Sequence, residues 1–151
     1  MTMLNKYMQI LYENINLSSE DIPVVAMVVK NDDIISIATN KREKDNKVTA
    51  HAEILALEEA NRKLDSWRLD DCDMYVTLEP CPMCAWAIIN ARIKNLYFAS
   101  YDYKYGAFGS AINLAKLANS KINIQGGILE EKFDSVLKKY FEKIRNEKEV
   151  R

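Results

Sequence analysis

The sequence contains only one histidine, His51, in 151 residues. Any function that needs an imidazole must use this residue, and a metal site built from several histidines is excluded. Cysteine is also scarce, and the odd count of three argues against a closed disulfide framework. The third cysteine, Cys72, stands apart, whereas Cys81 and Cys84 form a close pair that indicates a metal-binding or redox site in a reducing compartment.

Long hydrophobic runs are missing as well. The longest strongly apolar run, Val24 to Val29, is far shorter than the roughly 20 residues of a membrane-spanning helix. The N-terminal residues lack the basic region and apolar core of a signal peptide. We therefore expect a cytoplasmic protein with no membrane partner.

The chain has almost no net charge, formally −1, so bulk charge does not indicate a nucleic-acid or membrane partner. With 48% hydrophobic and 28% charged residues, the composition excludes disordered, collagen-like and low-complexity classes. The length predicts one domain, residues 1–151, which is large enough to fold without disulfides.

Hydrophobic periodicity predicts an initial hairpin followed by alternating helices and strands. Helices are expected at residues 3–17, 52–64, 82–91, 111–118 and 129–148. Strands are expected at residues 24–29, 34–39, 74–78, 96–99 and 122–125, with polar loops at 40–49 and 100–110. This order indicates an α/β sandwich around one sheet.

Two short motifs carry the chemistry, His51-Ala52-Glu53 and Pro80-Cys81-Pro82-Met83-Cys84. One histidine and two thiolates supply three metal ligands and leave one tetrahedral position open, as in catalytic zinc sites. A fourth protein ligand would have to be Cys72 or a carboxylate. Because Cys72 lies in a polar stretch just before a predicted strand, we interpret it as a structural thiol.

Both motifs lie at predicted helix starts. Cys81 and Cys84 are one helical turn apart, and the helix dipole favours thiolates there. His51 and Glu53 are two residues apart, a spacing that does not share a helix face, so they converge only if His51 lies at the helix edge. Glu53 could then move a proton from a zinc-activated water to a leaving nitrogen.

Each motif alone is a weak signal, because a lone C-x-x-C also fits a redox or structural site. The combination H-x-E…P-C-x-x-C is typical of zinc nucleobase deaminases. It predicts Zn²⁺ held by His51, Cys81 and Cys84, with Glu53 as the catalytic residue.

The motifs Thr49–Ile54 and Tyr75–Ala85 resemble the cytidine deaminase-like superfamily. The loop Asp102–Ser110 is similar to the D-x-K-x-G-x-x-G-S loop of the bacterial tRNA adenosine deaminase family within it. The resemblance implies a three-layer α/β/α sandwich with a central mixed five-stranded sheet. It also implies zinc-dependent deamination of adenosine to inosine at the wobble position of a tRNA anticodon loop.

The resemblance further implies a homodimer with one zinc per subunit and active sites that draw on both subunits. Its substrate-binding residues would be Asn40, Ala52, Pro80, Asp102, Lys104, Tyr140 and Phe141. Two of these have plainer interpretations, Asp102 as a turn-forming residue and Asn40 as the cap of a strand end.

Three residues depart from the family pattern: Val25, Val48 and Trp86. Trp86 replaces a common glycine and is either a core or interface residue or part of an altered pocket. Local charge is uneven, because residues 138–151 hold six basic and three acidic side chains and residues 41–47 hold four and two. Such basic regions would suffice for contacts to RNA phosphates.

Three alternatives stay open. The nearest is a guanine, cytosine or other free-base or nucleoside deaminase of the same fold. The second is a non-catalytic zinc-binding subunit of a tRNA deaminase, against which Glu53 argues. The third is a C-x-x-C redox protein.

Overall fold

The structure is a computed structural model that describes residues 1–150. Arg151, one of the basic residues of the C-terminal segment, lies outside the described residues. Among residues 1–150, no helix combines the length and the apolar character that crossing a bilayer requires. The helices are α1 (Met3–Glu13), α2 (Arg42–Asp45), α3 (Ala52–Leu64), α4 (Pro82–Asn90), α5 (Leu114–Leu117) and α6 (Glu130–Val150). The strands are β1 (Val25–Lys30), β2 (Asp33–Thr39), β3 (Cys72–Leu78), β4 (Asn95–Ser100) and β5 (Asn123–Gln125).

The five strands form one mixed sheet in the order β2-β1-β3-β4-β5. Strand β1 is antiparallel to β2 and β3, whereas β3, β4 and β5 are parallel. Parallel neighbours need crossover connections, and α4 provides the one between β3 and β4. The predicted five-stranded mixed sheet is confirmed.

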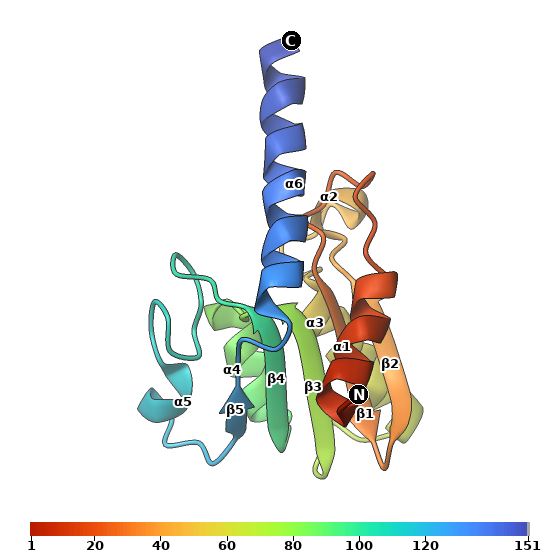
Figure 1. Cartoon of the computed structure of the whole chain (residues 1–151). Helices are drawn as coiled ribbons and strands as arrows, with labels where there is room; N and C mark the ends of the chain where they lie inside the picture. The colour runs from red at the N-terminus through yellow and green to blue at the C-terminus, as the bar shows by residue number, and fades with distance from the viewer. Residues whose placement is uncertain (151) are drawn as a thin grey trace.

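Helices cover both faces of this sheet (Figure 1). Each face of the sheet has its own hydrophobic core, and alternate residues of β1 point into one or the other. Val25 and Met27 pack with α1 and α6, whereas Ala26 and Val28 pack with α3 and α4. Burial on both sides explains why the strand is apolar throughout rather than alternating. The predicted three-layer α/β/α sandwich is therefore confirmed.

Two predicted helices and one predicted loop differ from the structure. The first helix ends at Glu13 because Asn14 caps it, and its side-chain amide donates to the Ile10 carbonyl at 2.8 Å. The helix expected at 111–118 is reduced to the short α5. Part of the loop expected at 40–49 is helical, because the buried Asp21 carboxylate accepts the backbone N–H groups of Glu43 (2.7 Å) and Lys44 (3.2 Å).

The fold brings the starts of α3 and α4 to one end of the sheet. Helix α4 begins directly beyond the carboxyl end of β3, and the loop after β4 leaves the sheet at the same end. In α/β sheets ligands bind at this carboxyl end of the parallel strands. Figure 1 shows α2 at the end of the sheet from which the C-terminal half of α6 projects.

Candidate active site

Two helix N-termini place the histidine beside the cysteine pair. His51 is the N-cap of α3 and Cys81 is the N-cap of α4. Within the described residues neither side chain makes a capping hydrogen bond, so both can face outward from their helices. His51 Nδ1 lies 3.7 Å from Cys81 Sγ and 3.4 Å from Cys84 Sγ. All three ligand atoms lie within 4.8 Å of one another.

These separations fit a tetrahedral zinc ion. Zinc–sulfur bonds of about 2.3 Å and zinc–nitrogen bonds of about 2.0–2.1 Å at tetrahedral angles put ligand atoms roughly 3.5–3.8 Å apart. The donor set of one imidazole nitrogen and two sulfurs is also one that zinc prefers. His51, Cys81 and Cys84 can therefore hold the metal without rearrangement of the backbone.

The pKa values of the two thiols are shifted in opposite directions. A hydrogen bond from Cys84, and secondarily one from His51, lowers the pKa of Cys81 to about 4. The same sulfur–sulfur hydrogen bond, together with burial, raises the pKa of Cys84. A bound cation would take both sulfurs as thiolates, because metals bind the deprotonated form of cysteine.

Glu53 lies against this cluster, in the first turn of α3. Its side chain is 4% exposed, and burial raises its pKa from 4.5 to about 7. His51 precedes the helix with extended backbone angles (φ −73°, ψ 151°), so the two residues are not held to the helical spacing that separates positions i and i+2. The geometric condition set by the sequence is therefore met.

A cavity of about 400 Å³ opens onto the cluster. Its size is within the range of about 300–1,000 Å³ that is typical of small-molecule sites. Apolar side chains and a few polar groups form its walls. The lining residues are Ile22, Val24, Asn40, Arg42, His51, Ala52, Glu53, Leu78, Glu79, Cys81, Asp102 and Tyr105.

Three of the predicted substrate contacts, Asn40, Ala52 and Asp102, line this cavity. Asn40 also accepts the Arg42 backbone N–H at 3.2 Å, in keeping with its interpretation as a cap. Asp102 also accepts the backbone N–H groups of Lys104 (3.1 Å) and Tyr105 (3.0 Å) and so shapes the loop. Both residues therefore combine a local structural role with a position at the cavity.

The other four predicted contacts are not among the described residues that line the cavity; they are Pro80, Lys104, Tyr140 and Phe141. Pro80 is buried, and its carbonyl accepts the Ala107 N–H at 2.9 Å. Tyr140 is buried, and its hydroxyl donates to the Glu20 carbonyl at 2.6 Å. Lys104 and Phe141 are exposed. The geometry gives Tyr140 a packing role in the fold.

Glu79 is a site residue that sequence reasoning treated only as part of a motif. Its buried carboxylate accepts the backbone N–H groups of Asp102 (3.2 Å), Phe108 (3.1 Å) and Ser110 (3.1 Å), and also the Ser110 hydroxyl. A Cβ at Gly106 would lie 2.4 Å from this carboxyl group, so the glycine permits the close approach. The available signal was an acidic residue directly after a buried strand.

Two residues with alternative interpretations lie away from the cavity. Trp86 is half exposed on α4 and is not among the described lining residues, so the structure gives no support to an altered pocket. Cys72 is fully buried in the core at the start of β3, the opposite end of that strand from Cys81. Burial raises the pKa of the Cys72 thiol, which fits its interpretation as a structural thiol.

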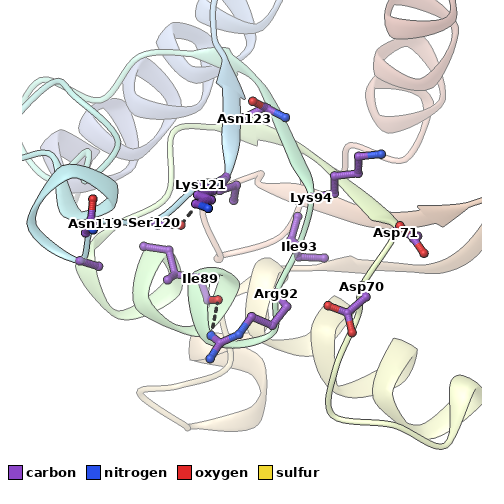
Figure 2. A pocket seen from close by; sticks show the side chains of 12 residues that line it. Asp70, Asp71, Ile89, Arg92, Ile93, Lys94, Asn119, Ser120, Lys121 and Asn123 are labelled. Atoms are coloured by element: carbon purple, nitrogen blue, oxygen red, sulfur yellow. Dashed lines mark hydrogen bonds between the residues drawn. The ribbon is translucent and has the colours of Figure 1, made fainter.

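A second hollow, of about 590 Å³, lies at the opposite end of the sheet, before β3, β4 and β5 begin (Figure 2). Its charged residues are of both signs and include Asp70, Asp71 and Lys94. Arg92 also lines this hollow, and its guanidinium donates to the Ile89 carbonyl of α4 at 3.2 Å (Figure 2). None of the described groups of metal-ligating residues lies there.

Comparison with known proteins identifies the family. The model of MafB19-like deaminases matches residues 2–145. The chain belongs to this family. It is 38% identical to the tRNA-specific adenosine deaminase of Bacillus subtilis (strain 168) over 132 residues, which are 86% of this chain and 82% of the relative. The resemblance to tRNA adenosine deaminases and the prediction of an enzyme of this type are confirmed.

Two solved structures bear on the substrate. One, described as a tRNA:A34 deaminase that edits A to I at the wobble position of transfer RNA, superposes with a TM-score of 0.75 at 35% identity, covering 78% of this chain and 86% of the other. Guanine deaminase from Bacillus subtilis superposes with a TM-score of 0.59 at 31% identity, covering 80% and 73%. A tRNA deaminase and a guanine deaminase therefore share the fold of this chain.

Proposed function

We propose that this deaminase converts adenosine to inosine at the wobble position of a tRNA anticodon loop, with one zinc per subunit. The observation that carries the proposal is the convergence of His51, Cys81 and Cys84 beside the buried Glu53, at one end of a 400 Å³ cavity. The similarity to a tRNA:A34 deaminase supports the choice of substrate.

His51, Cys81 and Cys84 would hold the zinc. When bound, zinc supplies a Lewis acid that activates water at neutral pH. Glu53 takes one proton of the attacking water and passes it to N1 of the purine. It then transfers the second proton of that water to the amino group, which leaves C6 as ammonia while the water oxygen stays on C6. A carboxylate whose pKa is about 7 can both accept and donate a proton near neutral pH.

The adenine would enter the cavity as an unpaired, extruded base, since its C6 cannot be reached inside a helical stack. Asn40 and Asp102 place polar groups on the cavity wall, and Ala52 lies beside the zinc ligands. Apolar contact comes from Ile22, Val24 and Leu78. These residues would orient the base with its amino group toward Glu53.

The RNA backbone would be bound by basic side chains in the C-terminal part of α6. Lys138, Lys139, Lys143, Arg145 and Lys148 lie on this helix, which projects beyond the sheet (Figure 1). Phosphate contacts of this kind position RNA without reading its sequence. The near-neutral charge of the whole chain does not oppose this, because basic side chains outnumber acidic ones by five to three over residues 138–150.

A homodimer would complete the active unit. The half-exposed Trp86 on α4, the helix that carries both cysteines, provides an apolar surface for a second copy. Large exposed aromatic side chains are enriched at protein interfaces.

A substrate comparison tests the proposed function. The zinc-loaded protein is incubated with a tRNA that carries a wobble adenosine and, separately, with free guanine, cytosine and cytidine. Inosine in the tRNA supports the proposal. Turnover of the small molecules alone would contradict it and would support the free-base alternative.

A further inference from the structure

Three tyrosines follow β4 in alternation with polar residues. Tyr101, Tyr103 and Tyr105 are 37%, 77% and 57% exposed. Tyr105 lines the cavity and Tyr101 begins the loop, so the group extends outward from the cavity wall. Rings as exposed as those of Tyr103 and Tyr105 contribute little to the core, and the concentration of three tyrosines in one short loop calls for a functional explanation.

The first ring is fixed by the fold. Tyr101 packs edge-on against Phe98, with ring centroids 5.1 Å apart and an interplanar angle of 88°. It also packs on the Gly126-Gly127 turn, where a Cβ at Gly126 would lie 3.0 Å from the ring. Tyr103 then stacks on Tyr101, with centroids 6.2 Å apart and an angle of 22°.

The backbone that carries the rings is fixed as well. Glu79 accepts the Asp102 N–H, and Asp102 in turn accepts the N–H groups of Lys104 and Tyr105. Lys104 Nζ lies 5.2 Å from the centroid of the Tyr105 ring, so a positive charge accompanies the aromatic surface. A rigid aromatic surface loses little conformational entropy when a ligand binds.

We propose that Tyr101, Tyr103 and Tyr105 form a stacking surface for the unpaired nucleobases that flank the target adenosine. The inference rests on the proposed function and adds the site that holds the neighbours of the target base. Unpaired RNA bases bind proteins by stacking on aromatic rings, and a nearby cation attracts their phosphates. Tyr105, shared by the cavity and the loop, would connect target and flanking nucleotides.

The test uses zinc-loaded protein and an anticodon stem-loop RNA. The variants Tyr103→Leu and Tyr105→Leu remove an aromatic ring but keep an apolar side chain, whereas Tyr103→Phe and Tyr105→Phe keep the ring. Trp67→Leu is the matched control, because Trp67 is also exposed (60%) but precedes β3 at the other end of the sheet. The KM for the RNA, the kcat and the zinc content are measured for each.

We expect each leucine variant to raise the KM at least about fivefold, as is typical of the loss of one base–aromatic stack. The phenylalanine variants and Trp67→Leu should retain the wild-type KM, and zinc content should not change. On an RNA whose nucleotides next to the target lack bases, the wild-type protein and the leucine variants should give the same KM.

Any of three results would overturn the stacking surface while leaving the proposed function intact. One is a wild-type KM for both leucine variants. The second is an equal effect of the leucine and phenylalanine substitutions, and the third is an equal effect of the leucine substitutions on intact and base-less RNA. If the wild-type protein produces no inosine in any RNA, the proposed function itself fails, and the inference fails with it.

Discussion

His51 Nδ1 lies 3.4 Å from Cys84 Sγ, although 33 residues separate the two in the chain. The contact exists because α3 and α4 start at the same end of the sheet. It joins the single histidine to the cysteine pair and makes a three-ligand metal site possible.

Replacement of His51 by alanine is expected to abolish both zinc binding and activity, because the chain has no other histidine. Zinc per chain is measured by elemental analysis after gel filtration. Cys72→Ala is the control, since Cys72 lies at the far end of β3 and should leave zinc unchanged. Full zinc in His51→Ala, or loss of zinc in Cys72→Ala, would contradict the ligand assignment.

The buried Glu53 makes the stability of the metal-stripped protein depend on pH. Burial raises the folded-state pKa of this acid from 4.5 to about 7, so the folded state binds more protons and stability falls as pH rises through that window. A shift of this size corresponds to a loss of about 3 kcal/mol in the free energy of unfolding as the pH rises from below 4.5 to above 7.

The measurement is the free energy of unfolding by urea at pH 5 and pH 8, for the wild type and for Glu53→Gln. Both proteins share the other titrating groups of the cluster, so the difference between their pH profiles isolates Glu53. Between pH 5 and pH 8, the free energy of unfolding should fall less for the glutamine variant than for the wild type. If the free energies of unfolding of the two proteins changed equally with pH, ionisation of Glu53 would not destabilise the folded state, and the prediction would be wrong.

Glu79→Gln is expected to loosen the loop at 101–110. A glutamine amide nitrogen cannot accept the N–H groups that the Glu79 carboxylate binds, and each buried N–H left unpaired costs about 1–3 kcal/mol. Urea unfolding should show this loss, and the KM should rise because Asp102 and Tyr105 shift. Glu59→Gln is the control, because Glu59 is a partly exposed carboxylate that is paired with Arg62 on the surface of α3. Identical behaviour of the two variants would refute the role of Glu79.

Trp86→Glu is expected to dissociate the proposed dimer, because a charge would enter an apolar interface. Analytical ultracentrifugation should give twice the 17.4 kDa chain mass for the wild type and a shift toward the single chain for the variant. The control is Trp67→Glu, which changes an exposed tryptophan elsewhere. A monomeric wild type, or equal masses for both variants, would contradict the proposal.

Local patterns predicted the parts of the structure that depend on nearby residues. The spacing of Cys81 and Cys84 indicated one helical turn, and the helix from Ala52 to Leu64 is found at the predicted bounds. The three-ligand group could be predicted because the candidate ligands were so few. The spacing of His51 and Glu53 could not show that their side chains lie close together, because this depends on the extended backbone at His51.

The features that were not predicted depend on contacts between distant segments. Helix α2 forms because Asp21 caps it from about twenty residues away, and Glu79 binds a loop some thirty residues further along. Tyr140 is buried because α6 packs its hydroxyl against the Glu20 carbonyl. In each case the type of residue is equally compatible with an exposed and with a buried position. Only the packing of distant segments of the fold decides between them.

The most direct test of the central claim is position-resolved detection of inosine in a tRNA with a wobble adenosine. The wild type and Glu53→Gln, each loaded with zinc, are compared at pH 7. Inosine is expected at the wobble position alone with the wild type, and a rate lower by about 10²–10⁴-fold is expected with Glu53→Gln at unchanged zinc content. A normal rate in the variant, or no inosine with the zinc-loaded wild type, would contradict the central claim.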